Sequence, residues 1–566
     1  MSKLWPRLLC YLWIAALGFS FYISLRTSYR QSLSTEEFAY ACDSFGYLRM
    51  AKQIRHAYAH AVMPEFTLES PQTRLLIDFM KQKQIALPLW DEVVAPHGHH
   101  YFPQSGYVGV QYPPGTGLIL AMFPQGQAVY RLNRIVVFVF LGVCVATLII
   151  AAWNRAWASI GLVALALNLG LMVLARLGAL TFSMNAVLVP ILFLCLLSLL
   201  ALRLQAAGRN RLALLSALLA GICLGIATLI RLPSFLLAPG IVILLWPGFR
   251  KFRVMSLPVA LAAGATIVGV IPVVINQHFV AGAWYLSTYA RVDTATPALG
   301  NLHDNLPYFL GNGPATLDNW ALFSGFVGLA GFLMIYLRHS PHLDRLGLTW
   351  KRFLLAIGLL WVVSICYFLT KKVTGPHYMI SPIFATLTLI GFGALEIEIT
   401  SEKVRRFDRR KALSWVAVLL VLWPGAATIK DVWSNRSLGR APERASTHPP
   451  ILLPAELVDD KAWVWADLLT GSLWYYANKP AFKIQFTDEE VRAMIFKFVY
   501  DRGERQYLIQ DSEQMKVYVK EIEQLGGTLE PRGKVDGQPY YLINWPNGVP
   551  DHKTAQKAQN VFELSL

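Results

Sequence analysis

A series of long apolar runs limits how this chain can fold more than any other feature of its sequence. Most of the runs hold about 20 mostly apolar residues, the length at which an α-helix crosses the hydrocarbon core of a bilayer. The run at 233–247 is the shortest and is flanked by proline. The sequence therefore predicts an α-helical polytopic membrane protein with about eleven spans, at 8–26, 134–153, 157–176, 180–202, 211–230, 233–247, 254–275, 320–337, 353–370, 377–396 and 412–429.

The composition agrees with this class of protein. Of 566 residues, 55% are hydrophobic and 15% are charged, and the mean hydropathy is +0.42. These values lie outside the range of soluble globular proteins. The formal charge of +16 does not indicate nucleic-acid binding, because Lys and Arg cluster between the apolar runs, where they act as topology signals. Five of the six cysteines lie inside apolar runs, so no disulfide framework is predicted.

The basic residues predict how the spans are oriented. Cytoplasmic loops carry an excess of Lys and Arg, and with the N-terminus inside this alternation holds across all the predicted spans, up to a basic stretch at 403–411. The first run ends in Arg26 without a small-residue cleavage site, which indicates an uncleaved span. A large first loop at 27–133 and the chain from about residue 430 are therefore expected on the outer side of the membrane.

These outer segments are expected to fold on the outer surface of the bundle. Apolar residues at helical spacing at 42–60 and 71–85 predict amphipathic helices along the interface. A linker at 430–454 separates the membrane module, 1–429, from an outer region at 455–566. Alternating strand-like and helix-like segments there predict a small extracytoplasmic α/β domain with a largely parallel sheet. Its expected role is accessory, either structural support or acceptor binding.

Asp43 lies in the first outer loop, in the stretch Asp43-Ser-Phe-Gly-Tyr47-Leu-Arg-Met-Ala51. If this stretch is helical, Asp43 and Tyr47 share one face. An acid at the start of a helix has a structural explanation, because it caps the helix and suits its dipole. A catalytic role is the alternative that the spacing leaves open.

This stretch, together with Tyr112-Pro-Pro-Gly115 at the end of the same loop, resembles the membrane glycosyltransferases of the C superfamily. It is most similar to bacterial members related to protein mannosyltransferases and to the aminoarabinose transferase of lipid A. The likeness covers the number and orientation of the helices, the large first loop and the outer C-terminal domain. In the second motif, Pro-Pro fixes two backbone angles and Gly115 permits the turn.

The resemblance implies that Asp43 is the catalytic base of an inverting sugar transfer from a polyprenyl-phosphate donor. A sugar hydroxyl is a poor nucleophile, so a carboxylate within reach must accept its proton as it attacks the anomeric carbon. The acceptor could be a glycan, a lipid or a protein. The protein is accordingly expected in the bacterial cytoplasmic (inner) membrane, with its active site on the periplasmic side.

Cations are needed to hold the leaving phosphate, and basic residues at the outer ends of spans are the candidates. One candidate segment resembles the family's segment containing Arg-Tyr, but has His377 where Arg is usual. Snorkelling to lipid headgroups is the alternative explanation for such residues. The residues expected to bind the donor or its phosphate are Arg131, Arg231, Lys371, Lys372, His377 and Tyr378.

Tyr47, Tyr112 and Glu37 are expected to line the cavity around Asp43. Many members of the superfamily carry two acids separated by one residue in this loop, often with a metal, whereas Cys42 and Ser44 flank Asp43 here. No cofactor is therefore expected to be required, and a divalent metal is an alternative that the sequence does not support.

Three histidines in the same loop, His97, His99 and His100, lie close enough together to suggest a zinc site. They have no cysteine nearby and lie in a turn context. Solvated or hydrogen-bonded histidines are therefore expected rather than metal ligands.

The leading hypothesis is a membrane glycosyltransferase that moves a sugar from a polyprenyl-phosphate donor to its acceptor on the outer side of the membrane. A transporter or flippase of lipid-linked sugars is one alternative, but it predicts charges near the middle of the membrane, and the spans contain almost none. A non-catalytic assembly subunit is another, and it predicts that Asp43 is dispensable.

Overall fold

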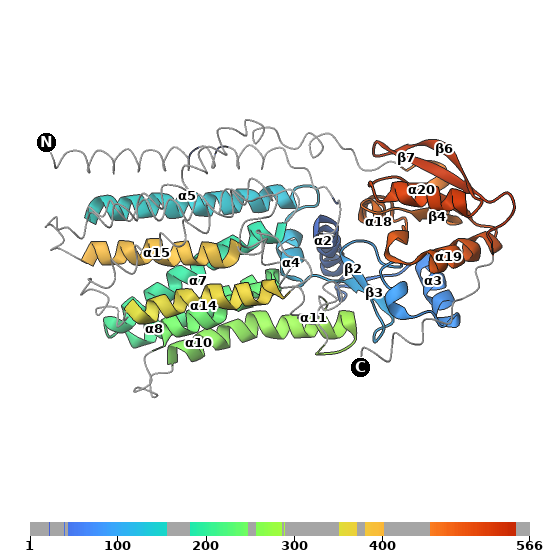
Figure 1. Cartoon of the computed structure of the whole chain (residues 1–566). Coiled ribbons are helices and arrows are strands. Elements are labelled where there is room, and N and C mark those ends of the chain that lie inside the picture. Colours follow the sequence, from blue (N-terminus) through green and yellow to red (C-terminus); the bar gives the residue numbers. More distant parts are fainter. Residues whose placement is uncertain are drawn as a thin grey trace.

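The computed structural model describes residues 43–154, 182–246, 256–285, 350–370, 380–400 and 453–550, together with residues 22, 26, 39 and 288. The predicted spans at 157–176, 320–337 and 412–429, and most of the span at 8–26, lie outside the described residues. Figure 1 shows apolar helices side by side at one end of the molecule and residues 453–550 at the other, with elements of the first outer loop between them.

The apolar helices form a bundle. Five helical stretches are long and apolar enough to cross a membrane, namely Ala128–Thr147, Ser183–Ala206, Asn210–Ile230, Leu257–Ala281 and Lys351–Leu369. They confirm that five of the predicted runs are long apolar helices. They belong to α5 (Ala128–Asn154), α7 (Phe182–Ala206), α8 (Asn210–Ile230), α10 (Ser256–Ala265) continued through η4 (Thr266–Val270) into α11 (Ile271–Ala281), and α14 (Trp350–Leu369).

Two further predicted spans are also helical. The run at 233–247 forms the 3₁₀-helix η2 (Leu232–Leu237) and the short α9 (Ala238–Leu245). Prolines lie in the first turn of both, and because proline has no backbone N–H, an unbroken α-helix through them is disfavoured. The run at 377–396 is helical from Ile380, where α15 (Ile380–Thr400) begins. Ser381–Gly393 is an apolar stretch within this helix.

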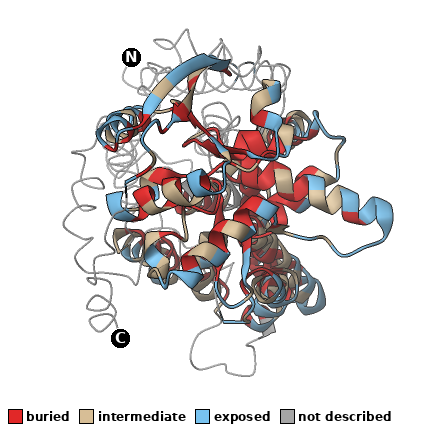
Figure 2. Cartoon of the chain, turned by 90° about the vertical axis from the view of Figure 1, so that its right-hand side faces the viewer, coloured by how far each residue is buried: buried red, intermediate tan, exposed pale blue. Residues whose placement is uncertain are grey.

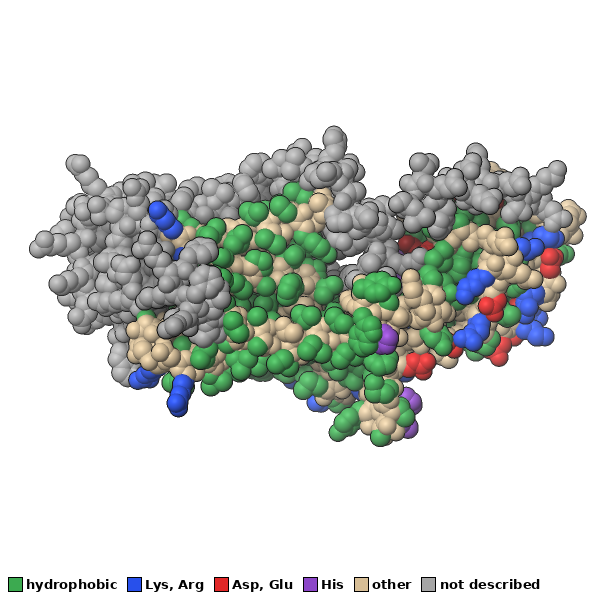
Figure 3. Space-filling model, turned by 90° about the horizontal axis from the view of Figure 1, so that it is seen from below, with side chains coloured by type: hydrophobic (Ala, Val, Ile, Leu, Met, Phe, Trp, Pro, Cys, Tyr) green, Lys and Arg blue, Asp and Glu red, His purple; other side chains and the backbone are tan. Residues whose placement is uncertain are grey.

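The outer surface of the bundle suits a lipid environment. Figure 3 shows its visible face covered by hydrophobic side chains, whereas Lys, Arg, Asp and Glu gather over the end of the molecule that holds residues 453–550. Inside the bundle, α8 packs closely on α10, since a Cβ added at Gly221 would lie 2.0 Å from the carbonyl oxygen of Leu261. Small residues allow helices in membranes to approach in this way. Helix α8 is thereby fixed, and its outer end reaches the candidate site.

The first outer loop folds into helices and a small sheet. The helices predicted at 42–60 and 71–85 are confirmed as α2 (Asp43–His60) and α3 (Pro71–Gln82). Helix α3 starts after Ser70, whose hydroxyl accepts the N–H of Thr73, as N-cap residues do. The antiparallel sheet, which was not predicted, has the order β1 (Thr67–Leu68), β3 (Tyr107–Val110), β2 (His99–Phe102), and η1 (Leu87–Leu89) and α4 (Gly115–Ala121) complete the loop.

Residues 453–550 form a four-stranded sheet in the order β4-β5-β7-β6. Only β4 and β5 run parallel, so the prediction of a largely parallel sheet is wrong. The reason is local: Asp536 and Gly537, both with positive φ, make a tight turn that joins β6 to β7, and a two-residue turn joins antiparallel strands. The elements are α17 (Ala455–Val458), β4 (Ala462–Trp465), α18 (Thr470–Ala477), η8 (Ile484–Phe486), α19 (Glu489–Asp501), β5 (Arg505–Ile509), α20 (Met515–Gln524), β6 (Thr528–Val535) and β7 (Gln538–Asn544).

This C-terminal region and the first outer loop share one core. The rings of Phe79 and Phe498 stack with centroids 4.2 Å apart. The side-chain amide of buried Gln72 donates to the carbonyl oxygens of Asp460 and Ala462, at 2.8 and 3.0 Å. Figure 2 shows buried residues gathered in the middle of the molecule and exposed ones around them. The C-terminal region is therefore packed on the first loop rather than tethered beside it.

The Gln72 contact predicts a measurable loss of stability. Replacing Gln72 by Ala leaves two carbonyl oxygens without this donor, which costs about 1–2 kcal/mol. Thermal unfolding of the C-terminal region, followed by tryptophan fluorescence, should occur at a lower temperature in Gln72→Ala. Gln82→Ala, at an exposed position of the same helix, should melt like the parent, and equal melting of both variants would contradict the shared core.

Candidate active site

Asp43 is the first residue of α2, and its side chain is partly buried. Its Oδ1 accepts a hydrogen bond from the hydroxyl of Tyr112 at 2.6 Å, across 69 residues of sequence. The position in the first helical turn suits the helix dipole, as the structural explanation of this acid required. Helix capping does not account for the hydrogen bond from Tyr112, which fixes the carboxylate against a second motif of the loop.

Close packing in the first loop brings the Tyr112 ring to Asp43. A Cβ at Gly46 would lie 2.6 Å from that ring, so only glycine leaves room for it there. The rings of Tyr47 and Tyr112 pack with centroids 4.5 Å apart. Tyr47 and Tyr112 are only 1% and 3% exposed, and that they line the cavity around Asp43 stays a prediction. The gap at Gly46 makes room for the Tyr112 ring, whose hydroxyl contacts the carboxylate.

Arg231 follows the C-terminal residue of α8, beside the Tyr-Pro-Pro-Gly turn. The helix ends at Ile230, because Arg231 has extended backbone, two residues before Pro233. The hydroxyl of Thr116 donates to the carbonyl oxygen of Ile230 at 3.4 Å, and a Cβ at Gly115 would lie 2.5 Å from the Leu229 backbone. Helix α4 thus sits directly on the end of α8, and Arg231 is brought to the acid.

Three influences set the pKa of the Asp43 carboxyl. Burial is the largest and raises the pKa, whereas the Tyr112 hydrogen bond and the positive charge of Arg231 lower it, and the net pKa lies above the ordinary value of the group. Burial penalises the ionised form, and a donor or a cation favours it. A carboxylate with a raised pKa in a site that also holds a cation is suited to accept a proton.

Helix α18 of the C-terminal region holds the chain that leads into α2. The hydroxyl of Ser472 donates to the carbonyl oxygen of Ala39, and the hydroxyl of Tyr476 accepts the N–H of Ala39 at 3.0 Å. A Cβ at Gly471 would lie 2.6 Å from the Phe45 side chain, so the backbone of α18 rests on that ring. Helix α18 therefore contacts the chain on both sides of Asp43, at Ala39 and at Phe45.

Two cations of α2 add to this contact. The guanidinium of Arg49 lies 5.7 Å from the centre of the Trp474 ring, and the ammonium of Lys52 lies 5.6 Å from that of Tyr475. Contacts of this kind are attractive, more so when they are shielded from water. They fix the rotation of α2 about its axis, and with it the direction of its first residue.

The three histidines are engaged in contacts within the protein. His97 Nε2 lies 2.9 Å from Asp467 Oδ1, and His100 Nε2 lies 2.6 Å from the side-chain oxygen of Gln111. The ring of His99 is buried 5.0 Å from that of Phe45. Burial lowers the pKa of both His97 and His99. In the part of the chain that the structure describes, no group of three His, Cys, Asp or Glu side chains is arranged to hold a metal ion.

The predicted site residues fall into three groups. Asp43, Tyr47, Tyr112 and Arg231 are brought together. Arg131 is exposed on α5 and donates to the side-chain oxygen of Gln127, one turn earlier, at 2.9 Å. The remaining predicted residues lie outside the described part of the chain and are Glu37, Lys371, Lys372, His377 and Tyr378.

Sequence reasoning missed the residues of α18. Ser472 and Tyr476 contact Ala39 across 433 and 437 residues, and neither belongs to a motif of the first loop. The alternating pattern of 455–566 predicts helices there, but a helical pattern does not reveal which distant segment a helix contacts.

If the contacts between α18 and Ala39 are weakened, amide hydrogens around Asp43 should exchange faster. Tyr476→Phe removes the acceptor of the Ala39 N–H, so peptides covering 39–46 should exchange faster in the full chain. Tyr500→Phe removes a hydroxyl from a residue that is 40% exposed on α19 and should leave this exchange unchanged. Unchanged exchange in Tyr476→Phe would show that α18 does not hold the segment.

No known family profile matches the sequence, and no curated protein matches it. Among solved structures, the chain is similar to ArnT from Cupriavidus metallidurans in the apo state, with 15% identity, a TM-score of 0.46, and coverage of 96% of this chain and 99% of that chain. It is similar to the same protein bound to undecaprenyl phosphate, with 14% identity, a TM-score of 0.45 and the same coverage. Likeness at this level does not extend to donor, acceptor or catalytic residues.

Proposed function

We propose that this chain is a membrane glycosyltransferase that moves a sugar from a polyprenyl-phosphate donor to an acceptor hydroxyl on the outer side of a bacterial inner membrane. The observation that carries the proposal is the Asp43 carboxylate, bonded by the Tyr112 hydroxyl at 2.6 Å and held within the influence of the Arg231 charge. A base, and a cation whose charge acts on it, are what the transfer needs from the protein.

In the proposed reaction, Asp43 accepts the proton of the acceptor hydroxyl as its oxygen attacks the anomeric carbon. The bond between that carbon and the phosphate oxygen breaks, and its electron pair leaves on the phosphate. Attack from the side opposite the phosphate inverts the anomeric carbon. Such proton transfer typically accelerates a reaction by about 10²–10⁴-fold. The reaction as proposed requires no cofactor.

Arg231 is proposed to hold the phosphate. Its fixed charge, close to the carboxylate, would stabilise the negative charge that develops as the phosphate leaves. Because it follows the last residue of an apolar helix, it lies where the phosphate of a lipid anchored in the bilayer would be found. Lys371, Lys372, His377 and Tyr378 remain proposed as further donor-binding residues on the strength of their sequence alone.

Loss of the base is the direct test of this function. Asp43→Asn keeps the size of the side chain but cannot accept a proton, so we expect transfer to fall by about 10²–10⁴-fold. The measurement is release of polyprenyl phosphate from synthetic polyprenyl-phosphate sugars by the purified full chain, with cell-envelope glycans as acceptors. Asp501→Asn, at an exposed position of α19, should transfer like the parent. Full transfer by Asp43→Asn would show that Asp43 is not the base, whereas an absence of transfer in the parent as well would favour the assembly-subunit alternative.

The Tyr112 hydrogen bond makes a separate prediction about pH. The bond lowers the pKa of Asp43, so Tyr112→Phe should raise it further. Because the base works only when it is deprotonated, the acid limb of the pH–rate profile should move to higher pH, while the rate well above this limb is less affected. An acid limb that stays in place would show that the limb does not report Asp43.

A further inference from the structure

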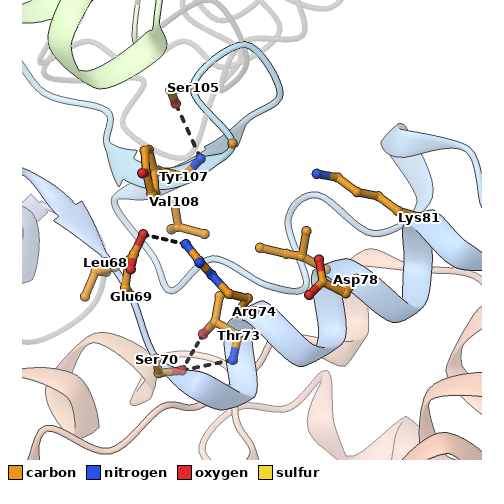
Figure 4. Close-up of a pocket in the computed structure, with 12 residues that line it drawn as sticks. Leu68, Glu69, Ser70, Thr73, Arg74, Asp78, Lys81, Ser105, Tyr107 and Val108 are labelled. Carbon is orange, nitrogen blue, oxygen red and sulfur yellow. Dashed lines mark hydrogen bonds and ion pairs between the residues drawn. The ribbon is translucent and has the colours of Figure 1, made fainter.

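A pocket lies on the first outer loop, on the face formed by α3 and the strands β1 and β3. Its volume is about 300 Å³, at the lower end of the range of small-molecule sites. Figure 4 shows side chains from α3 facing those of the strands across it. Buried Leu68, Ile77 and Val108 provide apolar surface in its wall, and exposed polar side chains surround it.

The charges around the pocket balance. Two acids, Glu69 and Asp78, face two bases, Arg74 and Lys81. The side chains of Arg74 and Glu69 form an ion pair at 3.0 Å. A site for an anion or a cation would carry an excess of the opposite charge, so this balance favours a ligand without net charge.

The same side chains offer many hydrogen bonds to such a ligand. Carboxylates accept several hydrogen bonds and an ammonium donates three, and Figure 4 shows Lys81 reaching from α3 toward the middle of the pocket. Tyr107, which is 40% exposed, adds a flat ring that ends in a hydroxyl. Donors, acceptors and apolar surface in one pocket fit a molecule that carries many hydroxyls on a ring with apolar C–H faces, as a sugar does.

The walls of the pocket are fixed before any ligand binds. The Ser70 hydroxyl accepts the N–H of Thr73 at 2.9 Å and donates to its hydroxyl at 2.8 Å. On the opposite wall, the Ser105 hydroxyl donates to the carbonyl oxygen of Val280 at 3.0 Å and so ties the turn between β2 and β3 to α11. A preformed site loses less entropy on binding.

Strand β3 connects this pocket to the candidate active site. It starts at Tyr107, in the pocket wall, and ends at Val110, two residues before Tyr112, whose hydroxyl holds Asp43. The three extended steps of β3 alone cover roughly 10 Å. A molecule that occupies the pocket and presents a hydroxyl to Asp43 must therefore be longer than one sugar.

We propose that the pocket is a binding site for an uncharged sugar unit. We assign that unit to the non-reacting part of an oligosaccharide acceptor, an assignment that rests on the proposed function. Tyr107, Asp78 and Lys81 then bind the acceptor at a distance from the reacting hydroxyl and help to select a glycan over a free monosaccharide.

The experiment measures binding to the full chain in lipid nanodiscs by saturation-transfer NMR. The probes are chitotriose, maltotriose and cellotriose, with a sulfated heparin disaccharide as the charged probe. At least one neutral trisaccharide should bind, and Tyr107→Ala and Asp78→Asn should each weaken this binding by about tenfold, the effect of losing one good contact. Lys81→Met should weaken it as well, and the matched variant Lys83→Met, at an exposed lysine of the same segment outside the pocket, should not.

The proposal is overturned if none of the neutral trisaccharides binds, if the pocket variants bind as tightly as the parent, or if only the sulfated probe binds. Asp43→Asn separates this proposal from the function proposed above. If binding is absent but transfer still depends on Asp43, the pocket assignment fails and the transferase stands. If the trisaccharide binds through Tyr107 while the parent releases no polyprenyl phosphate from the donor, the sugar site stands and the proposed function fails.

Discussion

The hydrogen bond from the Tyr112 hydroxyl to the Asp43 carboxylate is the interaction around which the described structure is organised. Burial works against the charged form of this acid, and the hydroxyl and the Arg231 charge offset that cost. Without such partners a buried carboxylate takes up a proton and is no longer a base. The packing of the first loop, the end of α8 and the C-terminal region each help to position this pair.

Three segments that are far apart in sequence converge on the pair, and glycines let them approach. Gly46 makes room for the Tyr112 ring, Gly115 lets α4 rest on the end of α8, and Gly471 lets α18 rest on Phe45. In each case a Cβ would lie too close to its neighbour. The C-terminal region therefore contributes to the site without placing one of its own residues beside the carboxylate, which favours structural support as its role and leaves acceptor contact to the first loop.

Much of this could be predicted from the sequence, for physical reasons. Apolar runs of spanning length predict helices because lipid leaves backbone groups no other partner. The motifs around Asp43 and Tyr112 lie at the two ends of one loop, and Arg231 ends an apolar run, so topology alone suggested that they meet. What could not be predicted depends on contacts across the chain: the contacts of Ser472 and Tyr476 with Ala39 span more than 430 residues, and the packing of the Tyr112 ring depends on the gap at Gly46. The mixed sheet was missed because the positive-φ turn at Asp536 and Gly537 was not recognised.

The central claim is that Asp43 and Arg231 form one site for a polyprenyl-phosphate sugar. The most direct measurement is a cryo-electron-microscopy structure of the full chain with a non-transferable polyprenyl-phosphate sugar. The account predicts the phosphate within hydrogen-bond reach of the Arg231 guanidinium and the anomeric carbon facing the Asp43 carboxylate, with the Tyr112 bond in place. A donor bound with its phosphate away from Arg231, or with its sugar turned away from Asp43, would contradict it.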